Sequence, residues 1–325
     1  MGKQLRIWLF VLLSTLLAST TLLAQGIITM TTSKAVGEKI KLRVEANGNV
    51  TIEGAQETGE TDDLDCKSYR LTSQTITIRG DVTELDCSFN QLTSLDVSKN
   101  TALINLDCSR NQLTSLDVSK NSALTRLNCS ANGLTSLNLP KSTALTTLDC
   151  SFNQLTSLDV SKNTALTVLG CNGNKLTSLD VSKNTALTEL YCSWNQLISL
   201  NVSKNTALTE LDCSWNQLTS LNVSKNTALK VLECSGNQLT SLNISGCARL
   251  NILYCSSNCI KGKAMTKLVN SLPNRRKKSS GTLSIVTRSS KKRDRNRCSA
   301  ADVTTAKKKN WIPPFDADTV CLPTR

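Results

Sequence analysis

The chain of 325 residues contains no histidine. Histidine is the usual general base and the commonest metal ligand near neutral pH. Its absence excludes Ser–His–Asp and Cys–His catalysis and argues against a catalytic zinc ion. Paired carboxylates remain as a route to sugar hydrolysis, but the carboxylates of this chain recur in repeated columns, and no pair is set apart. The sequence therefore predicts a protein that is not an enzyme and holds no metal or other cofactor.

Long apolar runs are also scarce, and the only one lies near the N-terminus, over residues 7–17. Basic residues precede this run and a Leu-Leu-Ala sequence follows it, as in a secretory signal peptide, which we place at residues 1–24. No later segment is apolar enough to cross a bilayer, and the last residues lack a sortase motif. We expect an exported protein, secreted or on the outer cell surface, without an integral membrane span after cleavage.

Acidic residues are few only in the last part of the chain. Residues 1–258 contain 21 basic and 21 acidic residues, whereas residues 259–325 contain 17 basic and 4 acidic residues, which accounts for the net charge of +13. Runs of cations there are candidate contacts for an anionic polysaccharide, lipid headgroups or nucleic acid; they comprise Arg275, Arg276, Lys277, Lys278, Lys291, Lys292 and Arg293. A basic loop surface without a ligand is the alternative.

Cysteine, in contrast, is abundant and regularly spaced. Ten of the 14 cysteines recur every 21 residues, at Cys66, Cys87, Cys108, Cys129, Cys150, Cys171, Cys192, Cys213, Cys234 and Cys255. A fixed period in the twenties is typical of a solenoid in which each repeat forms one turn. We therefore expect all ten cysteines to occupy one stacked column.

The full repeat reads L-x-x-L-x-C-x-x-N-x-L, as in residues 187–197. The second leucine and the cysteine alternate as in a strand, so both should face the core. The asparagine that follows each cysteine is expected to pair with backbone groups where the chain turns, rather than to bind a sugar. Twenty-one residues leave little room for a helix on the return side.

Stacked cysteines should remain reduced. Adjacent parallel strands lie about 4.8 Å apart, whereas a disulfide needs converging Cβ atoms about 3.8 Å apart. We expect buried free thiols that pack as small hydrophobic groups. Four cysteines lie outside the column, and Cys298–Cys321 with Cys247–Cys259 is one of three ways in which they could pair.

Most of the few aromatic residues, which make up 3% of the chain, fall in two variable columns that flank the cysteines. Exposed aromatic side chains beside carboxylates are typical of a binding surface. The predicted ligand-binding patch on the concave face comprises Tyr191, Trp194, Trp215, Glu189, Glu210, Asp212, Phe152 and Tyr254. The alternative is that these rings only shield strand ends.

The repeats occupy residues 64–259, between a β-rich N-terminal cap over residues 25–63 and a basic α/β cap over residues 260–325. In the first cap, alternating Thr and Val residues predict separate strands over residues 39–44 and 50–52. In the second, Met265, Leu268 and Leu272 fall at helical spacing, and Pro273 ends the helix.

The turn L-x-x-L-x-C-S-x-N-x-L-T-S-L-D-V-S-x-N-T-x-L resembles the cysteine-ladder leucine-rich repeats of internalin-J-like bacterial surface proteins. The resemblance implies a leucine-rich-repeat solenoid with a curved parallel β-sheet and little convex helix. It also implies adhesion to a host or bacterial surface protein or glycan, in virulence or biofilm settings. The alternatives are a self-associating matrix protein and a binder of anionic polysaccharide through the basic C-terminal region.

Overall fold

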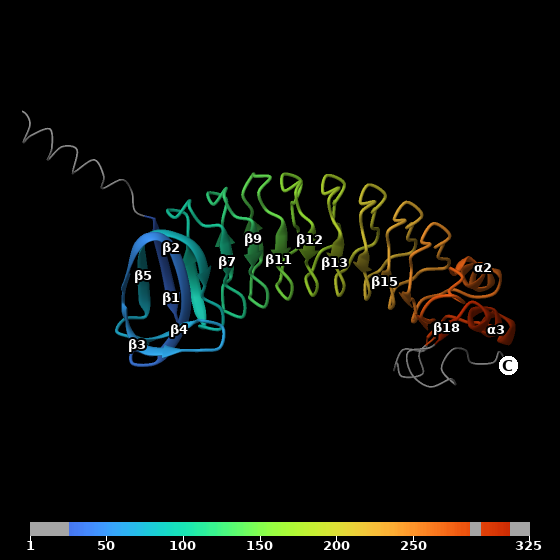
Figure 1. Cartoon of the computed structure of the whole chain (residues 1–325), viewed down its shortest axis with the longest axis horizontal. Helices are drawn as coiled ribbons and strands as arrows, with labels where there is room; N and C mark the ends of the chain where they lie inside the picture. The colour runs from blue at the N-terminus through green and yellow to red at the C-terminus, as the bar shows by residue number, and fades with distance from the viewer. Residues whose placement is uncertain (1–25, 287–293, 313–325) are drawn as a thin grey trace, which may run out of the picture.

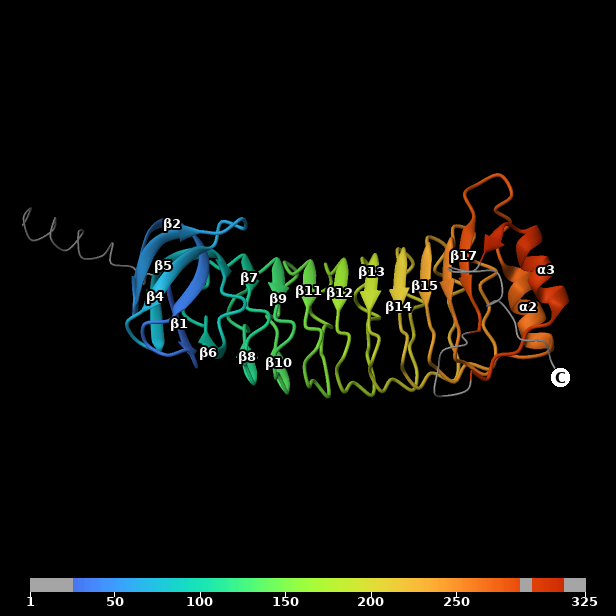
Figure 2. The same cartoon turned by 90° about the horizontal axis from the view of Figure 1, so that it is seen from below.

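The protein is a leucine-rich-repeat solenoid, as the repeat predicts. A computed structural model describes residues 26–286 and 294–312, so the predicted signal peptide lies outside the described residues. The stacked turns form an arc with a strand-rich cap at one end and two helices at the other (Figures 1 and 2). No helix in the described part of the chain is long and apolar enough to cross a membrane.

Each central turn contributes one short strand to a continuous parallel sheet. These strands are β7 (Asn105–Asp107), β9 (Arg126–Asn128), β11 (Thr147–Asp149), β12 (Val168–Gly170), β13 (Glu189–Tyr191), β14 (Glu210–Asp212), β15 (Val231–Glu233) and β16 (Ile252–Tyr254). They pair in register, leucine beside leucine. On the return side, β8 (Ser115–Asp117) and β10 (Ser136–Asn138) form a separate two-stranded sheet.

The N-terminal cap is antiparallel. It contains β1 (Ile27–Thr32), β2 (Lys39–Glu53), β3 (Ala55–Thr61), β4 (Lys67–Leu71) and β5 (Thr75–Asp86), and β6 (Leu92–Asp96) pairs with β1. The two short strands expected over residues 39–52 form the single strand β2, which shifts register at the Asn47-Gly48 bend. Strand β5 joins the two regions, because it pairs antiparallel with β1 and β2 and parallel with β7.

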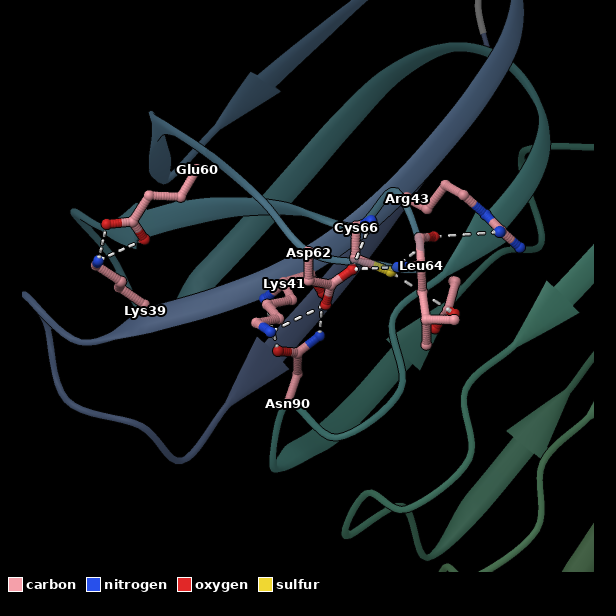
Figure 3. Close-up of polar contacts among 9 residues, drawn as sticks. Lys39, Lys41, Arg43, Glu60, Asp62, Leu64, Cys66 and Asn90 are labelled. Carbon is pink, nitrogen blue, oxygen red and sulfur yellow. Dashed lines mark hydrogen bonds and ion pairs between the residues drawn. The ribbon is translucent and has the colours of Figure 1, made fainter.

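The prediction that Cys66 stacks on the cysteine column was wrong. Its amide donates to Asp62 Oδ1 at 3.0 Å, within the turn before β4, rather than to the next rung. Strand β2 takes the missing place instead: Asn90 accepts from the Lys41 amide at 2.9 Å and donates to the Lys41 carbonyl at 2.6 Å (Figure 3). The same region is held by ion pairs of Lys39 with Glu60 and of Lys41 with Asp62 (Figure 3).

The physical reason for this difference is strand direction. A stacked rung requires a parallel neighbour, and residues 67–71 are instead paired antiparallel to β2. The 21-residue interval in the sequence therefore extends one repeat further than the stacked turns, which begin at Cys87.

The column from Cys87 to Cys255 is buried, with exposed fractions of 0%. All of its cysteines are free thiols, as predicted. The asparagine column closes each turn: Asn195 Nδ2 donates to the carbonyls of Cys171 and Cys192 at 2.9 and 3.2 Å. Its Oδ1 accepts from the Leu176 amide at 3.0 Å. The structural role predicted for these asparagines is confirmed.

The C-terminal cap contains α2 (Lys263–Ser271), β17 (Gly281–Ser284), α3 (Ala300–Lys308) and β18 (Trp311–Ile312), and β17 and β18 extend the parallel sheet. Asn296 completes one more turn, because it donates to the Cys255 carbonyl at 2.9 Å and accepts from the Ile260 amide at 2.7 Å. These are the bonds that a repeat asparagine makes. The last repeat is therefore sealed by a residue that the period of the sequence does not predict.

Of the four remaining cysteines, Cys247 and Cys259 are free, so the bridge considered between them does not form. Cys298 is disulfide-bonded. Its predicted partner, Cys321, lies outside the described residues.

Candidate functional site

Four neighbouring strands, β13 to β16, place polar and aromatic side chains on the face of the sheet that the repeat predicts to be concave. We call Glu189, Tyr191, Glu210, Asp212, Glu233 and Tyr254 the strand-face patch. The sheet register sets Glu189 beside Glu210, and the adjacent third positions of β13 to β16 hold Tyr191, Asp212, Glu233 and Tyr254. All six side chains are partly exposed. The fold thus brings together, in one contiguous row, residues that are 21 apart in the sequence.

Tyr191 lies at one end of this patch, on β13, within hydrogen-bond distance of two carboxylates. Its hydroxyl is 3.0 Å from Glu189 Oε2 and 2.8 Å from Glu210 Oε2. Burial and these two carboxylates raise the pKa of the Tyr191 hydroxyl. A phenol has one proton and donates to one carboxylate at a time, so the second carboxylate retains an accepting oxygen. Burial, together with Asp212 and Glu210, also raises the pKa of Glu233. The patch is a concentration of negative charge that a cationic group would relieve.

The tryptophans lie beyond the strand ends rather than on the strands. Trp194 and Trp215 belong to a column that we call the turn row, the residues directly before each repeat asparagine. It comprises Phe89, Arg110, Ala131, Phe152, Gly173, Trp194, Trp215, Gly236 and Ser257, all with positive φ between 53° and 69°. A left-handed conformation costs a non-glycine residue about 1–2 kcal/mol. The large exposed rings in this row are thus not the residues that the backbone alone would favour.

The rings of the turn row each lean over the following turn. Trp194 and Trp215 stack with their centroids 5.0 Å apart and their planes at 19°, in agreement with the expected spacing of about 5 Å. The next residue, Gly236, lies under the Trp215 ring, where an added Cβ would be 2.7 Å from the ring atoms. Phe152 covers Gly173 in the same way and lies two turns from Trp194.

A groove of about 610 Å³ opens beside the tryptophan pair, and we call it the tryptophan groove. Its lining residues are Trp194, Trp215, Asn216, Gln217, Gly236, Asn237, Gln238, Ser257, Asn258 and Arg295. No residue of the strand-face patch lines it. The residues predicted as one binding patch thus fall on two adjoining surfaces, the strand face and the edge formed by the turns.

Arg295 is the residue of this groove that the sequence did not reveal. It directly precedes Asn296 and lines the groove together with Ser257, without the positive φ of the turn row. The segment between Asn258 and Asn296 breaks the 21-residue period, and no local pattern marks the register of Arg295.

The predicted basic contacts are placed unequally. Arg275 is buried, and its guanidinium donates to the Leu250 carbonyl at 3.2 Å and the Ser279 carbonyl at 3.1 Å. It also lies 5.9 Å from the Trp311 ring centroid. Arg276, Lys277 and Lys278 are exposed. Lys291, Lys292 and Arg293 lie outside the described residues. Within residues 26–286 and 294–312, no cluster of three or more cysteines and carboxylates has an arrangement suited to a metal ion.

Comparison with known proteins supports the repeat assignment. A family model described as leucine-rich repeats (2 copies) matches residues 143–184. No curated protein matches the chain. Among solved structures, the chain is similar to the functional domain of InlJ from Listeria monocytogenes, described as including a cysteine ladder. The identity is 28%, over 74% of this chain and 69% of that one, with a TM-score of 0.39.

Two further solved structures are similar. An internalin (inlF) from Listeria monocytogenes is 17% identical, over 73% of this chain and 87% of its own, with a TM-score of 0.41. YopM from Yersinia enterocolitica is 28% identical, over 61% of this chain and 39% of its own, with a TM-score of 0.47.

The stacked repeats of the chain and the family model over residues 143–184 carry the assignment. The family model and the stacked 21-residue turns agree on the repeat type. The buried column from Cys87 to Cys255 supplies the cysteine ladder. The chain is a leucine-rich-repeat protein with a cysteine ladder, similar to the internalin-J-like repeats that its sequence resembles.

Proposed function

We propose that the chain is a secreted or surface-associated bacterial adhesion module, without enzymatic activity, that takes a protein ligand on the strand-face patch. Solenoids present extended concave surfaces that serve binding. The observation that carries the proposal is the row of Tyr191, Asp212, Glu233 and Tyr254 on adjacent strands, with Glu189 and Glu210 beside it. Two tyrosines among four carboxylates suit a basic segment of a partner protein, because phenol rings supply contact area and carboxylates pair with Lys and Arg.

Glu189 and Glu210 differ from the aspartates of the same face in a way that supports this proposal. Along the sheet, Asp86, Asp107 and Asp149 each accept a hydrogen bond at 2.9 Å from the amide two residues later, and Asp212 of the patch does the same. Those carboxylates serve the turns. Glu189 and Glu210 bond instead to Tyr191 across the surface and make no ion pair with any described residue. Their charge is available to a partner.

A binding screen tests the proposal. The full chain would be measured by surface plasmon resonance against a panel of host cell-surface and matrix proteins. Glu210→Lys should weaken the protein interaction about tenfold, the loss typical of a central interface residue. Thr147→Lys is the matched control, because it places lysine at the same strand position three rungs away. If no protein of the panel binds, or both variants bind alike, the proposal is wrong.

Trp194 and Trp215 adjoin the strand-face patch and can extend a protein interface along the turns. Replacing both with alanine should weaken adhesion without unfolding the chain. Sedimentation of the chain without a ligand tests the self-association alternative. Growth of the particles with protein concentration would favour a matrix protein.

The exposed Arg276, Lys277 and Lys278 support a second proposal, contact with an anionic polysaccharide. None of the three pairs with a carboxylate of the described residues, and such a run attracts polyanions in a salt-dependent way. Retention of the chain on heparin should fall steeply with added salt and fall further in Lys277→Ala. Absence of retention at low salt would exclude this contact.

A further inference from the structure

The turn row contains a gap at its C-terminal end. After the stacked Trp194 and Trp215, the next two positions hold only Gly236 and Ser257, and Arg295 follows. Adjacent turns are about 4.8 Å apart, so the backbone runs roughly 14 Å from Trp215 to Arg295. Small residues at the two middle positions leave the space that forms the tryptophan groove. The groove has an indole at one end, a guanidinium at the other and small residues along its floor.

The position of Arg295 is set by the cap. Asn296 makes the ladder bonds of a repeat asparagine, and Asp294 Oδ2 accepts from the Ser257 amide at 2.9 Å. In the preceding turn the corresponding amide, that of Gly236, donates to the Ser256 carbonyl. Arg295 is thus held between two anchored neighbours beside Ser257. It is exposed and makes no ion pair with any residue that the structure describes.

We propose that the tryptophan groove binds a sugar residue that carries a carboxylate. The apolar face of a sugar ring would pack against the indole of Trp215, as amphipathic ligands do on aromatic side chains. The exposed amides of Gln217 and Gln238 offer donors and acceptors to the ring hydroxyls. The guanidinium of Arg295 pairs with the carboxylate, for which its planar fork is suited. This goes beyond the protein ligand of the strand-face patch, because both the place and the ligand class differ.

The backbone supports a role for the rings themselves. The left-handed conformation of the turn row would be adopted more readily by glycine, which the row accepts at Gly173 and Gly236. Tryptophan therefore occupies two successive turns against the local backbone preference. The stacked pair presents one rigid wall, which loses little conformational freedom when a ligand binds.

Titration of the full chain with carboxylated oligosaccharides tests the proposal. Tetragalacturonate, a hyaluronan tetrasaccharide and sialyllactose are the probes, and maltotetraose is the neutral comparison. Trp194 and Trp215 provide a fluorescence signal at the groove; of the other two tryptophans, Trp311 is buried and Trp8 belongs to the predicted signal peptide. We expect at least one carboxylated probe to bind. Maltotetraose should bind the unaltered chain about tenfold more weakly than that probe. Arg295→Gln should lower the affinity for the carboxylated probe about tenfold, the loss typical of a key contact.

A second variant fills the groove without altering the ladder. Ser257→Phe places a ring where the same row already holds Phe89 and Phe152 at nearly the same φ. It should abolish binding, whereas the matched change Ala131→Phe, in the same row but far from the groove, should leave affinity unchanged. Neither Ser257 nor Arg295 belongs to the strand-face patch, so failure here and failure of the protein-binding proposal can be told apart.

Three results would overturn the inference. They are binding of no carboxylated probe, equal binding of maltotetraose, and equal effects of Ser257→Phe and Ala131→Phe. A poly-glutamate peptide bound more tightly than every carboxylated sugar, and lost in Arg295→Gln, would assign the groove to acidic peptides instead and so also contradict it.

Discussion

The two asparagine columns of the solenoid should differ sharply in what their removal costs. Asn195 Oδ1 is the acceptor recorded for the Leu176 amide. The cysteine carbonyls to which Asn195 donates also accept from Asn174 and Asn216. Asn195→Ala therefore leaves those carbonyls with hydrogen-bond partners, but it leaves the buried Leu176 amide without one.

Asn184, in the second column, is placed differently. Its Nδ2 donates to the carbonyls of Val160 and Asn163 at 3.0 and 2.8 Å, and each of these carbonyls also accepts a backbone amide. Its Oδ1 accepts no hydrogen bond from the described residues. Asn184→Ala therefore leaves no buried group without a partner.

The expected magnitudes follow from these bonds. Each lost hydrogen bond costs about 1 kcal/mol, and a buried amide left unpaired adds about 1–3 kcal/mol. We expect a loss in the free energy of unfolding of about 3–5 kcal/mol for Asn195→Ala and about 1–2 kcal/mol for Asn184→Ala. The sequence agrees with this ranking. In the second column, Ser142 and Cys247 replace asparagine, whereas every position of the first column from Asn90 to Asn258 is asparagine.

Urea denaturation, followed by far-UV circular dichroism, measures the free energy of unfolding of both variants. The comparison is valid when the free energy falls with urea concentration at the same slope in both. Asn184→Ala is the matched control, since it makes the same side-chain truncation in a neighbouring turn. Equal losses of unfolding free energy in the two variants, or a larger loss for Asn184→Ala, would refute the argument that the cost depends on whether a buried group loses its last hydrogen-bond partner.

Three further outcomes are expected. Burial raises the pKa of the ladder thiols, to about 12 for Cys171 and Cys255, against a usual value of 9.0. Because the folded value is the raised one, stability is full below pH 9 and falls between pH 9 and 12. The loss is about 1.4 kcal/mol per pH unit for each such thiol, so a urea midpoint that stays flat from pH 8 to 10.5 would contradict it. Titration of the denatured, unreduced chain with Ellman's reagent should find the twelve thiols that are free in the described residues, and fewer than nine would mean that ladder cysteines pair. Arg275→Ala should destabilise the C-terminal cap by about 2 kcal/mol, because the hydrogen bonds from its guanidinium to backbone carbonyls are lost. Lys277→Ala should lower only the retention on heparin. Thermal melts of both variants measure the difference, and equal melting temperatures would contradict the prediction.

Much of the fold follows from the period alone. An uninterrupted interval of 21 residues makes each side chain stack on its equivalent in the next turn, so the buried cysteines, the asparagine bonds and the outward aromatic columns could all be predicted. The strand-face patch was predictable for the same reason, because Tyr191, Asp212 and Tyr254 are related to their neighbours by whole repeats.

What the period could not indicate was decided where the repeats end. At the N-terminus the sequence keeps the interval at Cys66, yet antiparallel pairing of β2 with β4 removes that cysteine from the column, and the direction of a neighbouring strand is not encoded in spacing. At the C-terminus the interval is lost, yet hydrogen bonds of Asp294 and Asn296 place Arg295 at the tryptophan groove. Burial of Arg275 likewise depends on Trp311, which is distant in the sequence.

The sequence by itself therefore determined the stack and the columns that face outward, since both depend only on repetition. The tertiary structure alone decided where the stack begins and closes, that the tryptophans lie on the turn edge rather than on the strands, and that an arginine completes their groove. Those features depend on contacts between segments that share no repeat, and such contacts form only when the chain is folded.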